Sequence, residues 1–214
     1  MRINKETNEI QRVVALRNSR NKRHRYREFI VEGTTALEQA VEQGWSLCSL
    51  FYLDRHKLSD WAKGYLQESS CLDRYEVSDD IMDKIADRED RPEIIGVAQL
   101  NKHDFQTMEI GHPQVIMVLD EPKSPGNVGM LIRSAAAFGV SATVISGHAA
   151  DEYDPKCIRS SAGTFFSMPV YHVDGFKKFS EKVDSLKQSN TIQVITTGDR
   201  GDVSITDAKP KDTT

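Results

Sequence analysis

Hydrophobic and polar positions change along this chain in short blocks whose spacing predicts alternating helices and strands. In the first half, residues 34–44 carry apolar positions at helical spacing, with Thr34 or Thr35 as the expected N-cap and Gly44 after the end. Runs rich in β-branched and aromatic residues predict strands between the helices. The expected helices are 10–20, 34–44, 56–69 and 79–87, and the expected strands are 27–33, 46–53, 73–78 and 94–100. These blocks predict a small α/β unit that ends near residue 100.

The alternation becomes stricter after residue 114. The apolar run 114–120 has the length of a strand and suits a strand buried on both faces. The expected strands are 114–120, 142–147, 168–173 and 191–197, and the expected helices are 127–139, 154–163 and 175–189. Such alternation predicts a parallel sheet with right-handed crossovers, in which ligands bind beyond the carboxyl ends of the strands.

A polar stretch with a Gly-His-Pro sequence separates the two halves and has little periodicity. We therefore expect one domain over 1–100, a linker over 101–113 and a second domain over 114–214.

Composition narrows the class of protein. Hydrophobic residues make up 38% of the chain and charged residues 28%, and no apolar run approaches the roughly 18 residues of a membrane span. The N-terminus has no apolar signal segment. The three cysteines have no CxxC spacing and the histidines form no ligand pattern, which predicts a cytoplasmic protein with neither disulfides nor a metal site.

Charge is distributed unevenly. Residues 1–27 hold nine Lys or Arg against two Glu, a net charge of +7, so the remaining residues carry −11 of the total of −4. A basic segment on an acidic body favours a polyanionic partner such as nucleic acid. The alternative is that the basic segment is only a solvated helix face or a loose arm.

The expected helix 127–139 holds one arginine among small apolar residues. At about 100° per residue, an arc of roughly 120° faces the sheet and Arg133 lies about 150° from its centre. The residues of that arc are Val128, Leu131, Ile132, Ala135, Phe138 and Gly139. Asn127 is the expected N-cap. Taken alone, these two residues favour the simpler interpretation, an amphipathic helix that is capped by Asn127 and carries Arg133 as a surface arginine. The preceding loop lacks both the GxGxxG of a dinucleotide-binding site and the Gly-Lys-Ser/Thr of a P-loop.

Four stretches together resemble one family. "SPGNVGMLIRSAAAFGV" (124–140) is similar to the first signature motif of the SpoU/TrmH family of RNA ribose 2'-O-methyltransferases, with its Asn-x-Gly-x-x-x-Arg core. "DEYDPKCIRSSAGTFFSMPV" (151–170) resembles that family's Arg-x-Ser-x-Gly stretch. "RNKRHRYREFIVEG" (20–33) and "RPEIIGVAQL" (91–100) resemble the opening and the close of the substrate-binding domain found in ribosomal-RNA members.

The resemblance implies a fold and a reaction. The fold would be a small N-terminal α/β substrate-binding domain followed by a parallel-sheet, Rossmann-like SPOUT methyltransferase domain. The reaction would be methylation of a ribose 2'-hydroxyl of RNA by S-adenosylmethionine, with ribosomal RNA favoured and transfer RNA as the alternative. Arg133 and Asn127 would be the catalytic residues. A guanidinium is a poor base, so we expect Arg133 to bind phosphate and stabilise the developing alkoxide.

The same resemblance suggests where RNA and a second subunit would bind. The RNA contacts it implies, together with the charge pattern, are Arg20, Lys22, Arg23, Arg25, Arg159 and Ser161, with Tyr26 stacking on a base. Arg159 could instead pair with the acids at 151, 152 and 154. Family members usually form homodimers through the methyltransferase domain.

Two family motifs that build the trefoil knot around the cofactor have no counterpart in this sequence. These are a Gly-x-Glu loop and an Asn-x-Ser stretch, which would follow the expected strand 191–197. The expectation is therefore a fragment of a longer protein with most cofactor contacts missing, in which Thr197 and Gly198 border the cofactor. The competing hypothesis is a non-catalytic RNA-binding protein that lacks the cofactor site.

Overall fold

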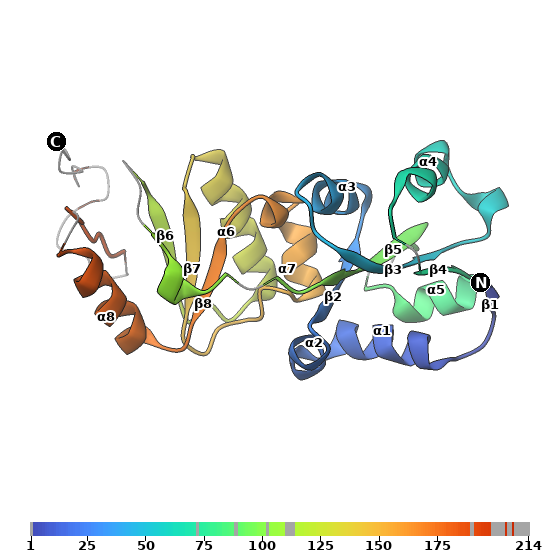
Figure 1. Cartoon of the computed structure of the whole chain (residues 1–214), viewed down its shortest axis with the longest axis horizontal. Helices are drawn as coiled ribbons and strands as arrows, with labels where there is room; N and C mark the ends of the chain where they lie inside the picture. Colours follow the sequence, from blue (N-terminus) through green and yellow to red (C-terminus); the bar gives the residue numbers. More distant parts are fainter. Residues whose placement is uncertain are drawn as a thin grey trace.

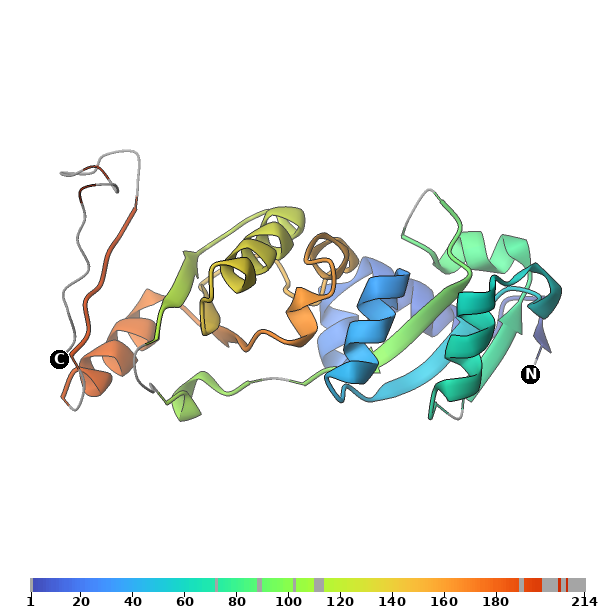
Figure 2. The same cartoon turned by 90° about the horizontal axis from the view of Figure 1, so that it is seen from above.

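The computed structural model describes residues 2–71, 73–87, 90–101, 103–109, 114–188 and 191–197, together with residues 204 and 207. Two α/β units lie end to end in an elongated molecule, and each is built on its own sheet (Figure 1, Figure 2). The predicted α/β fold class is confirmed.

The first unit contains a five-stranded mixed sheet in the order β1-β4-β3-β5-β2. β1 and β3 run parallel to β4, whereas β5 is antiparallel to β2 and β3. The strands are β1 (Arg2–Ile3), β2 (Glu28–Glu32), β3 (Leu47–Tyr52), β4 (Asp73–Val77) and β5 (Ile94–Gln99). The four predicted strands are present, and β1 was not predicted because two residues carry no pattern.

The helices of this unit depart from the predicted boundaries where a serine caps a helix. They are α1 (Asn8–Asn18), α2 (Arg20–Tyr26), α3 (Thr34–Glu42), α4 (Asp60–Glu68) and α5 (Asp79–Ile85), with a 3-10 turn η1 (Arg55–Lys57). The expected helix 10–20 ends early because Ser19 takes an extended conformation and its hydroxyl accepts from the backbone N–H of Lys22. Ser59 likewise caps α4 and delays its start.

The second unit contains a parallel sheet in the order β6-β7-β8, as the alternating pattern predicts. Its elements are η2 (Phe105–Thr107), β6 (Ile116–Asp120), α6 (Pro125–Ala137), β7 (Ala142–Ser146), α7 (Pro155–Ser160), η3 (Thr164–Phe166), β8 (Val170–Val173) and α8 (Phe176–Leu186). β7 is central and buried along its whole length. The prediction that the first strand is buried on both faces is wrong, because β6 is an edge strand of the described sheet and Val118 is 39% exposed.

The predicted strand 191–197 is also absent. Val194 and Ile195 are about half exposed, and no described strand pairs with this segment. A strand is stable only where its backbone N–H and C=O groups find ladder partners, so an apolar run without a neighbour stays irregular.

Aromatic residues join the two units in one continuous core. The ring of Phe29 on β2 lies 5.1 Å from that of Tyr153 in the second unit, and the ring of Trp45 lies 5.4 Å from that of Phe166. The Trp45 indole N–H also donates to the Phe166 carbonyl at 2.9 Å. α7 lies beside β2 (Figure 1). The first unit is therefore held against the second by buried apolar contacts.

The segment between the sheets runs along one side of the second unit (Figure 2). Its residues Phe105 and Met108 are buried against Val144 and Val173. The part of the predicted linker that is described is thus packed, while residue 102 and residues 110–113 lie outside the described residues.

Candidate functional site

Helix α6 begins at the carboxyl end of β6, two residues before the predicted start. Ser124 is the N-cap, and its hydroxyl accepts from the backbone N–H of Asn127 at 3.4 Å. Pro125 occupies the first helical position, where its missing N–H costs nothing. The prediction that Asn127 caps the helix is wrong. Because the Ser124 hydroxyl caps the helix, the exposed Asn127 side chain is not needed as the N-cap.

The buried face of α6 is rotated from the predicted one. Val128, Ile132 and Ala135 are buried as expected, but Leu131 is 40% exposed and Phe138 is 87% exposed. The reason is Gly129, which is buried against α7. A Cβ at this position would lie 2.1 Å from the Ser160 hydroxyl and 2.2 Å from the Cys157 carbonyl oxygen. The predicted wheel placed α6 against the sheet alone and missed this close approach.

A hydrogen bond fixes the start of α6 on α7. The Ser160 hydroxyl lies 2.9 Å from the Gly126 carbonyl oxygen and donates to it or to the Lys156 carbonyl. The first turn of α6, through Gly126, and the next part of the helix, through Gly129, are therefore both in contact with α7. This contact positions the exposed face of α6 relative to the rest of the second unit.

Arg133 is on that exposed face, as predicted. Within the described part of the chain its side chain makes no hydrogen bond or ion pair. At about 100° per residue, Arg133 and Leu131 bound an exposed arc of roughly 160°. That arc also carries Asn127, Met130 and Ser134. The unpartnered guanidinium is thus available to a ligand on this face.

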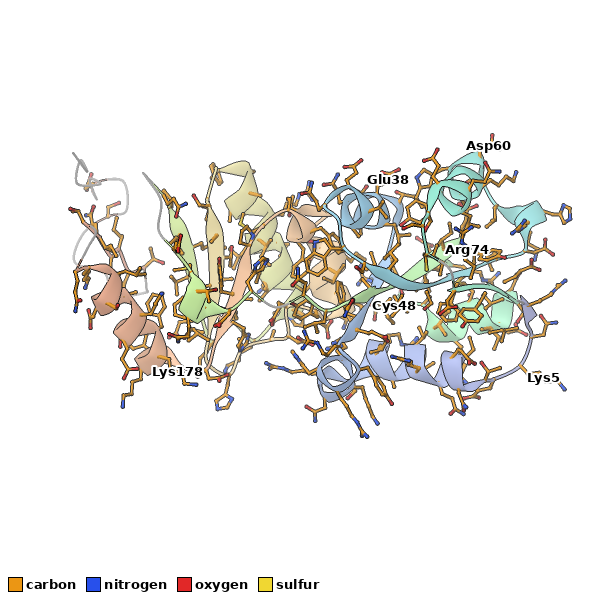
Figure 3. The ribbon with its side chains drawn as sticks, in the orientation of Figure 1. Lys5, Glu38, Cys48, Asp60, Arg74 and Lys178 are labelled. Carbon is orange, nitrogen blue, oxygen red and sulfur yellow. The ribbon has the colours of Figure 1, made fainter. Side chains whose placement is uncertain are left out.

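Helix α2 carries the basic segment. Its basic side chains extend into solvent (Figure 3). Arg20 and Arg25 are exposed, and Lys22 is half-buried. Arg20 donates to the Ala149 carbonyl oxygen at 3.0 Å and so reaches the second unit. The ring of Tyr26 already has two cations near it, Arg12 at 5.0 Å and Lys22 at 5.8 Å from its centroid.

Arg23, predicted to contact RNA, is instead buried at 2% exposure. Its Nε donates to Asp151 at 2.6 Å and its Nη2 to Asp154 at 3.2 Å. Its Nη1 donates to the Leu16 carbonyl oxygen at 2.8 Å. The prediction for Arg23 is wrong because the acids of the second unit occupy the guanidinium that a phosphate would need.

The Asp151 carboxylate, which pairs with Arg23, stays ionised although it is buried. Burial of Asp151 acts to raise its pKa, but the hydrogen bond from His24 and the charge and hydrogen bond of Arg23 together hold the pKa below its ordinary value. The ion pair therefore links the two units with a charged contact inside the protein.

Two further predicted RNA contacts are also placed differently. Arg159 does not pair with the nearby acids but with Asp87 of the first unit, at 2.7 Å, because Arg23 already holds Asp151 and Asp154. Ser161 is fully buried and its hydroxyl donates to the Ile158 carbonyl oxygen at 2.7 Å. A contact between Ser161 and RNA is thus excluded in this structure, whereas Arg159 is partly exposed.

The residues predicted to border a cofactor are not assembled into a site by the described residues. Thr197 is exposed, in a segment that joins no strand of the described sheet, and Gly198 lies outside the described residues. No group of three His, Cys, Asp or Glu side chains in the described ranges could hold a metal ion. No described helix is long and apolar enough to cross a membrane.

Comparison with protein families divides the chain in two. Residues 8–96 match the SpoU L30e-like domain, and residues 114–214 match the SpoU rRNA Methylase family.

Known proteins match both parts together. A 23S rRNA (uridine(2479)-2'-O)-methyltransferase of Streptomyces viridochromogenes is 33% identical over 208 residues, which are 96% of this chain and 72% of that protein. The 23S rRNA (guanosine(2553)-2'-O)-methyltransferase RlmP of Bacillus subtilis is 25% identical over 79% of this chain and 62% of its own length. The crystal structure of the SpoU methyltransferase AviRb from S. viridochromogenes with AdoMet superposes with a TM-score of 0.81, at 33% identity, over 87% of this chain and 70% of that one.

Proposed function

The chain belongs to the SpoU methyltransferase family, and from this premise we propose that it methylates a ribose 2'-hydroxyl of RNA with S-adenosylmethionine as the methyl donor. Ribosomal RNA is the favoured substrate, since the relatives named above act on 23S rRNA. Residues 1–100 would recognise the RNA and residues 114–214 would carry the reaction, joined by 101–113.

The observation that supports this proposal is the exposure of the Arg133 guanidinium. A helix that begins at the carboxyl end of a parallel strand presents an exposed guanidinium with no partner among the described residues. Ligands in parallel α/β sheets bind at that edge. An exposed arginine without a described partner, on the helix that starts at this edge, matches a substrate that supplies the negative charge.

The chain's own residues define the substrate side of the reaction. A guanidinium stays protonated in proteins, so Arg133 acts as a bidentate donor to an RNA phosphate and to the oxygen that becomes negative as the hydroxyl attacks. Asn127, relieved of capping by Ser124, can orient the ribose through its amide.

The direct test is methyl transfer from tritiated S-adenosylmethionine to ribosomal RNA by the purified protein. The expected product is a 2'-O-methylated nucleotide, which resists alkaline cleavage of the adjacent phosphodiester. RNA binding without any methyl transfer would instead favour the non-catalytic alternative. Methylation of a base would contradict the proposed reaction.

The exposed cations of α2 should give RNA binding its salt dependence. We expect replacement of Arg20, Lys22 and Arg25 by alanine to weaken binding and to make the slope of log affinity against log salt shallower by roughly 2, because each neutralised phosphate of single-stranded RNA contributes about 0.7 to that slope. Fluorescence anisotropy over a salt series measures both.

The matched control for α2 removes the same charge elsewhere. Alanine at Lys177, Lys178 and Lys187, which lie on α8 or at its C-terminal end, changes the net charge equally. This variant should keep nearly the wild-type slope. Equal slopes for the two triple variants would mean that α2 is only a solvated face.

We also propose that the protein is a cytoplasmic homodimer. Large apolar side chains are exposed on the second unit, and burying them against a second copy would be favourable. They are Val118, Met130, Leu131 and Phe138. The cytoplasmic assignment rests on three free cysteines, of which Cys71 and Cys157 are buried. Sedimentation velocity should give twice the chain mass, and a monomer at micromolar concentration would refute the dimer.

A further inference from the structure

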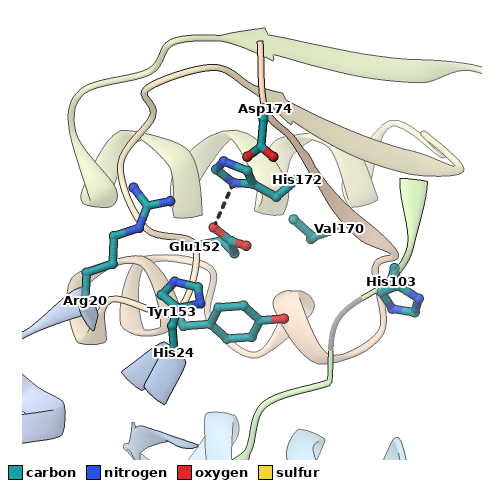
Figure 4. Close-up of a pocket in the computed structure, with 8 residues that line it drawn as sticks. All are labelled: Arg20, His24, His103, Glu152, Tyr153, Val170, His172 and Asp174. Carbon is teal, nitrogen blue, oxygen red and sulfur yellow. Dashed lines mark hydrogen bonds and ion pairs between the residues drawn. The ribbon is translucent and has the colours of Figure 1, made fainter. Parts of the chain in front are cut away.

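A cavity of about 360 Å³ lies between helix α2, the loop from β7 to α7, and strand β8. Arg20 and His24 enter it from α2, Glu152 from the loop, and His172 and Asp174 from β8 and the residue after it (Figure 4). It is close to the exposed cations of α2 and separate from Asn127 and Arg133, which do not line it. Its volume is at the lower end of the range for small-molecule sites.

Glu152 is the residue that makes this cavity unusual. It is 4% exposed, and one carboxylate oxygen accepts from His172 Nδ1 at 3.2 Å. Within the described part of the chain its other oxygen, Oε1, has no hydrogen-bond partner, and Figure 4 shows it directed into the open space of the cavity. This oxygen is open to the solvent of the cavity, since it is not among the buried side-chain oxygens that lack a partner, so a ligand that displaces water there must supply N–H groups in its place.

The charges around the cavity restrict that ligand further. The carboxylates of Glu152 and Asp174 would repel a simple anion, and Arg20 would repel a simple cation. An apolar ligand would leave Glu152 Oε1 without a donor. The hydrogen bond to Glu152 also raises the pKa of His172 despite the opposing effect of burial, which keeps His172 a donor to this carboxylate. The lining therefore matches a molecule with N–H donors at one end and a negative group at the other.

We propose that this cavity binds one guanine nucleotide, with Glu152 accepting from the base and Arg20 contacting the phosphate. Guanine presents two adjacent N–H donors on its Watson–Crick edge, which suit a carboxylate, whereas uracil presents one. Unpaired bases of RNA are recognised on this edge. Resting on the proposed function, we take the nucleotide to be an unpaired guanosine of the RNA substrate. A free guanine nucleotide has the same chemistry.

Binding to the 214-residue chain tests this directly and needs no methyl transfer. The probes are the RNA pentamers UUGUU, UUIUU and UUUUU, with I for inosine, together with GMP and guanosine, each titrated by calorimetry. We expect UUGUU to bind roughly ten- to a hundredfold more tightly than UUUUU, the scale of one well-placed base contact. UUIUU should fall between them because inosine lacks the exocyclic amine. GMP binding as tightly as UUGUU would assign the cavity to the free nucleotide.

Two variants separate the base contact from the phosphate contact. Glu152→Gln should abolish most of the preference for UUGUU over UUUUU, with Glu181→Gln on the exposed face of α8 as the matched control. Arg20→Ala, which removes an exposed side chain and its hydrogen bond to the Ala149 carbonyl oxygen, should remove the advantage of GMP over guanosine. A preference for guanine that survives Glu152→Gln in a folded protein would overturn the proposal, as would equal binding of all three pentamers.

These outcomes are independent of the proposed reaction. Methyl transfer by the wild-type protein without any guanine preference would refute only the cavity assignment. A guanine preference removed by Glu152→Gln, in a protein that transfers no methyl group, would support the cavity and refute only the reaction.

Discussion

Replacing Arg133 by alanine is expected to lower the turnover number for methyl transfer by roughly 10²- to 10³-fold, the usual cost of removing one donor to a developing oxyanion. The folded protein should hardly change, because the side chain is exposed and makes no hydrogen bond or ion pair within the described residues. A surface substitution of this kind alters the free energy of unfolding by about 0.5 kcal/mol or less. Single-turnover methyl transfer beside a thermal melt measures both quantities.

Two further variants make the Arg133 result specific. Arg133→Lys should not restore activity, because an ammonium cannot reproduce the two-pronged geometry of a guanidinium. Ser134→Ala, at the neighbouring exposed position of α6, should keep near wild-type turnover. If Arg133→Ala methylates RNA at the wild-type rate, the residue is a surface arginine and the proposed catalytic role is wrong.

Arg23→Met is expected to destabilise the protein by roughly 3–5 kcal/mol, because it leaves the buried Asp151 carboxylate without its main partner. For a chain of this size that corresponds to a fall of roughly 6–20 °C in melting temperature, at about 2–4 °C per kcal/mol. The control is Arg12→Met. Arg12 lies 2.6 Å from Glu28, the same distance as in the Arg23–Asp151 pair, but its side chain is about half exposed, so its loss should cost about 1 kcal/mol or less.

The effect of Arg23→Met should also depend on pH. Because the pKa of Asp151 is lowered in the folded protein, the stabilisation is present above the ordinary carboxyl pKa of about 3.9 and is lost as the pH falls through the lower folded value. The wild type and the variant should therefore converge in stability at acid pH. Equal melting temperatures at pH 7 would show that the ion pair contributes little to joining the units.

The Arg23–Asp151 ion pair gives one of the basic residues of α2 a structural role. Arg23 holds α2 on the second unit, while Arg20, Lys22 and Arg25 remain accessible at least in part beside it. The exposed cations of α2 are thus held in a fixed position relative to α6 and Arg133. A loose basic arm could attract RNA, but it could not position a ribose.

Local chemistry was enough to predict much of this protein from sequence. Run length and periodicity identified the strands that became β2 to β8 and the exposed position of Arg133, because both depend on residues close together in the chain. The ordered set of motifs identified the family. Most helix starts lay within a few residues of the predicted ones. Helix α2 was not predicted, and the errors at Ser19, Ser59 and Ser124 arose at capping serines, which a helical wheel does not consider.

Only the tertiary structure decided which partners the polar and apolar groups would have. Arg23 looks like its basic neighbours in the sequence, yet it is buried because Asp151, 128 residues away, meets it across the two units. The segment 191–197 looks like a strand but no described strand pairs with it. Glu152 looks like an ordinary loop acid, and its unpaired oxygen becomes visible only once α2 and β8 enclose a cavity. Burial and pairing depend on contacts between residues far apart in the chain, and a pattern read along the sequence contains no information about them.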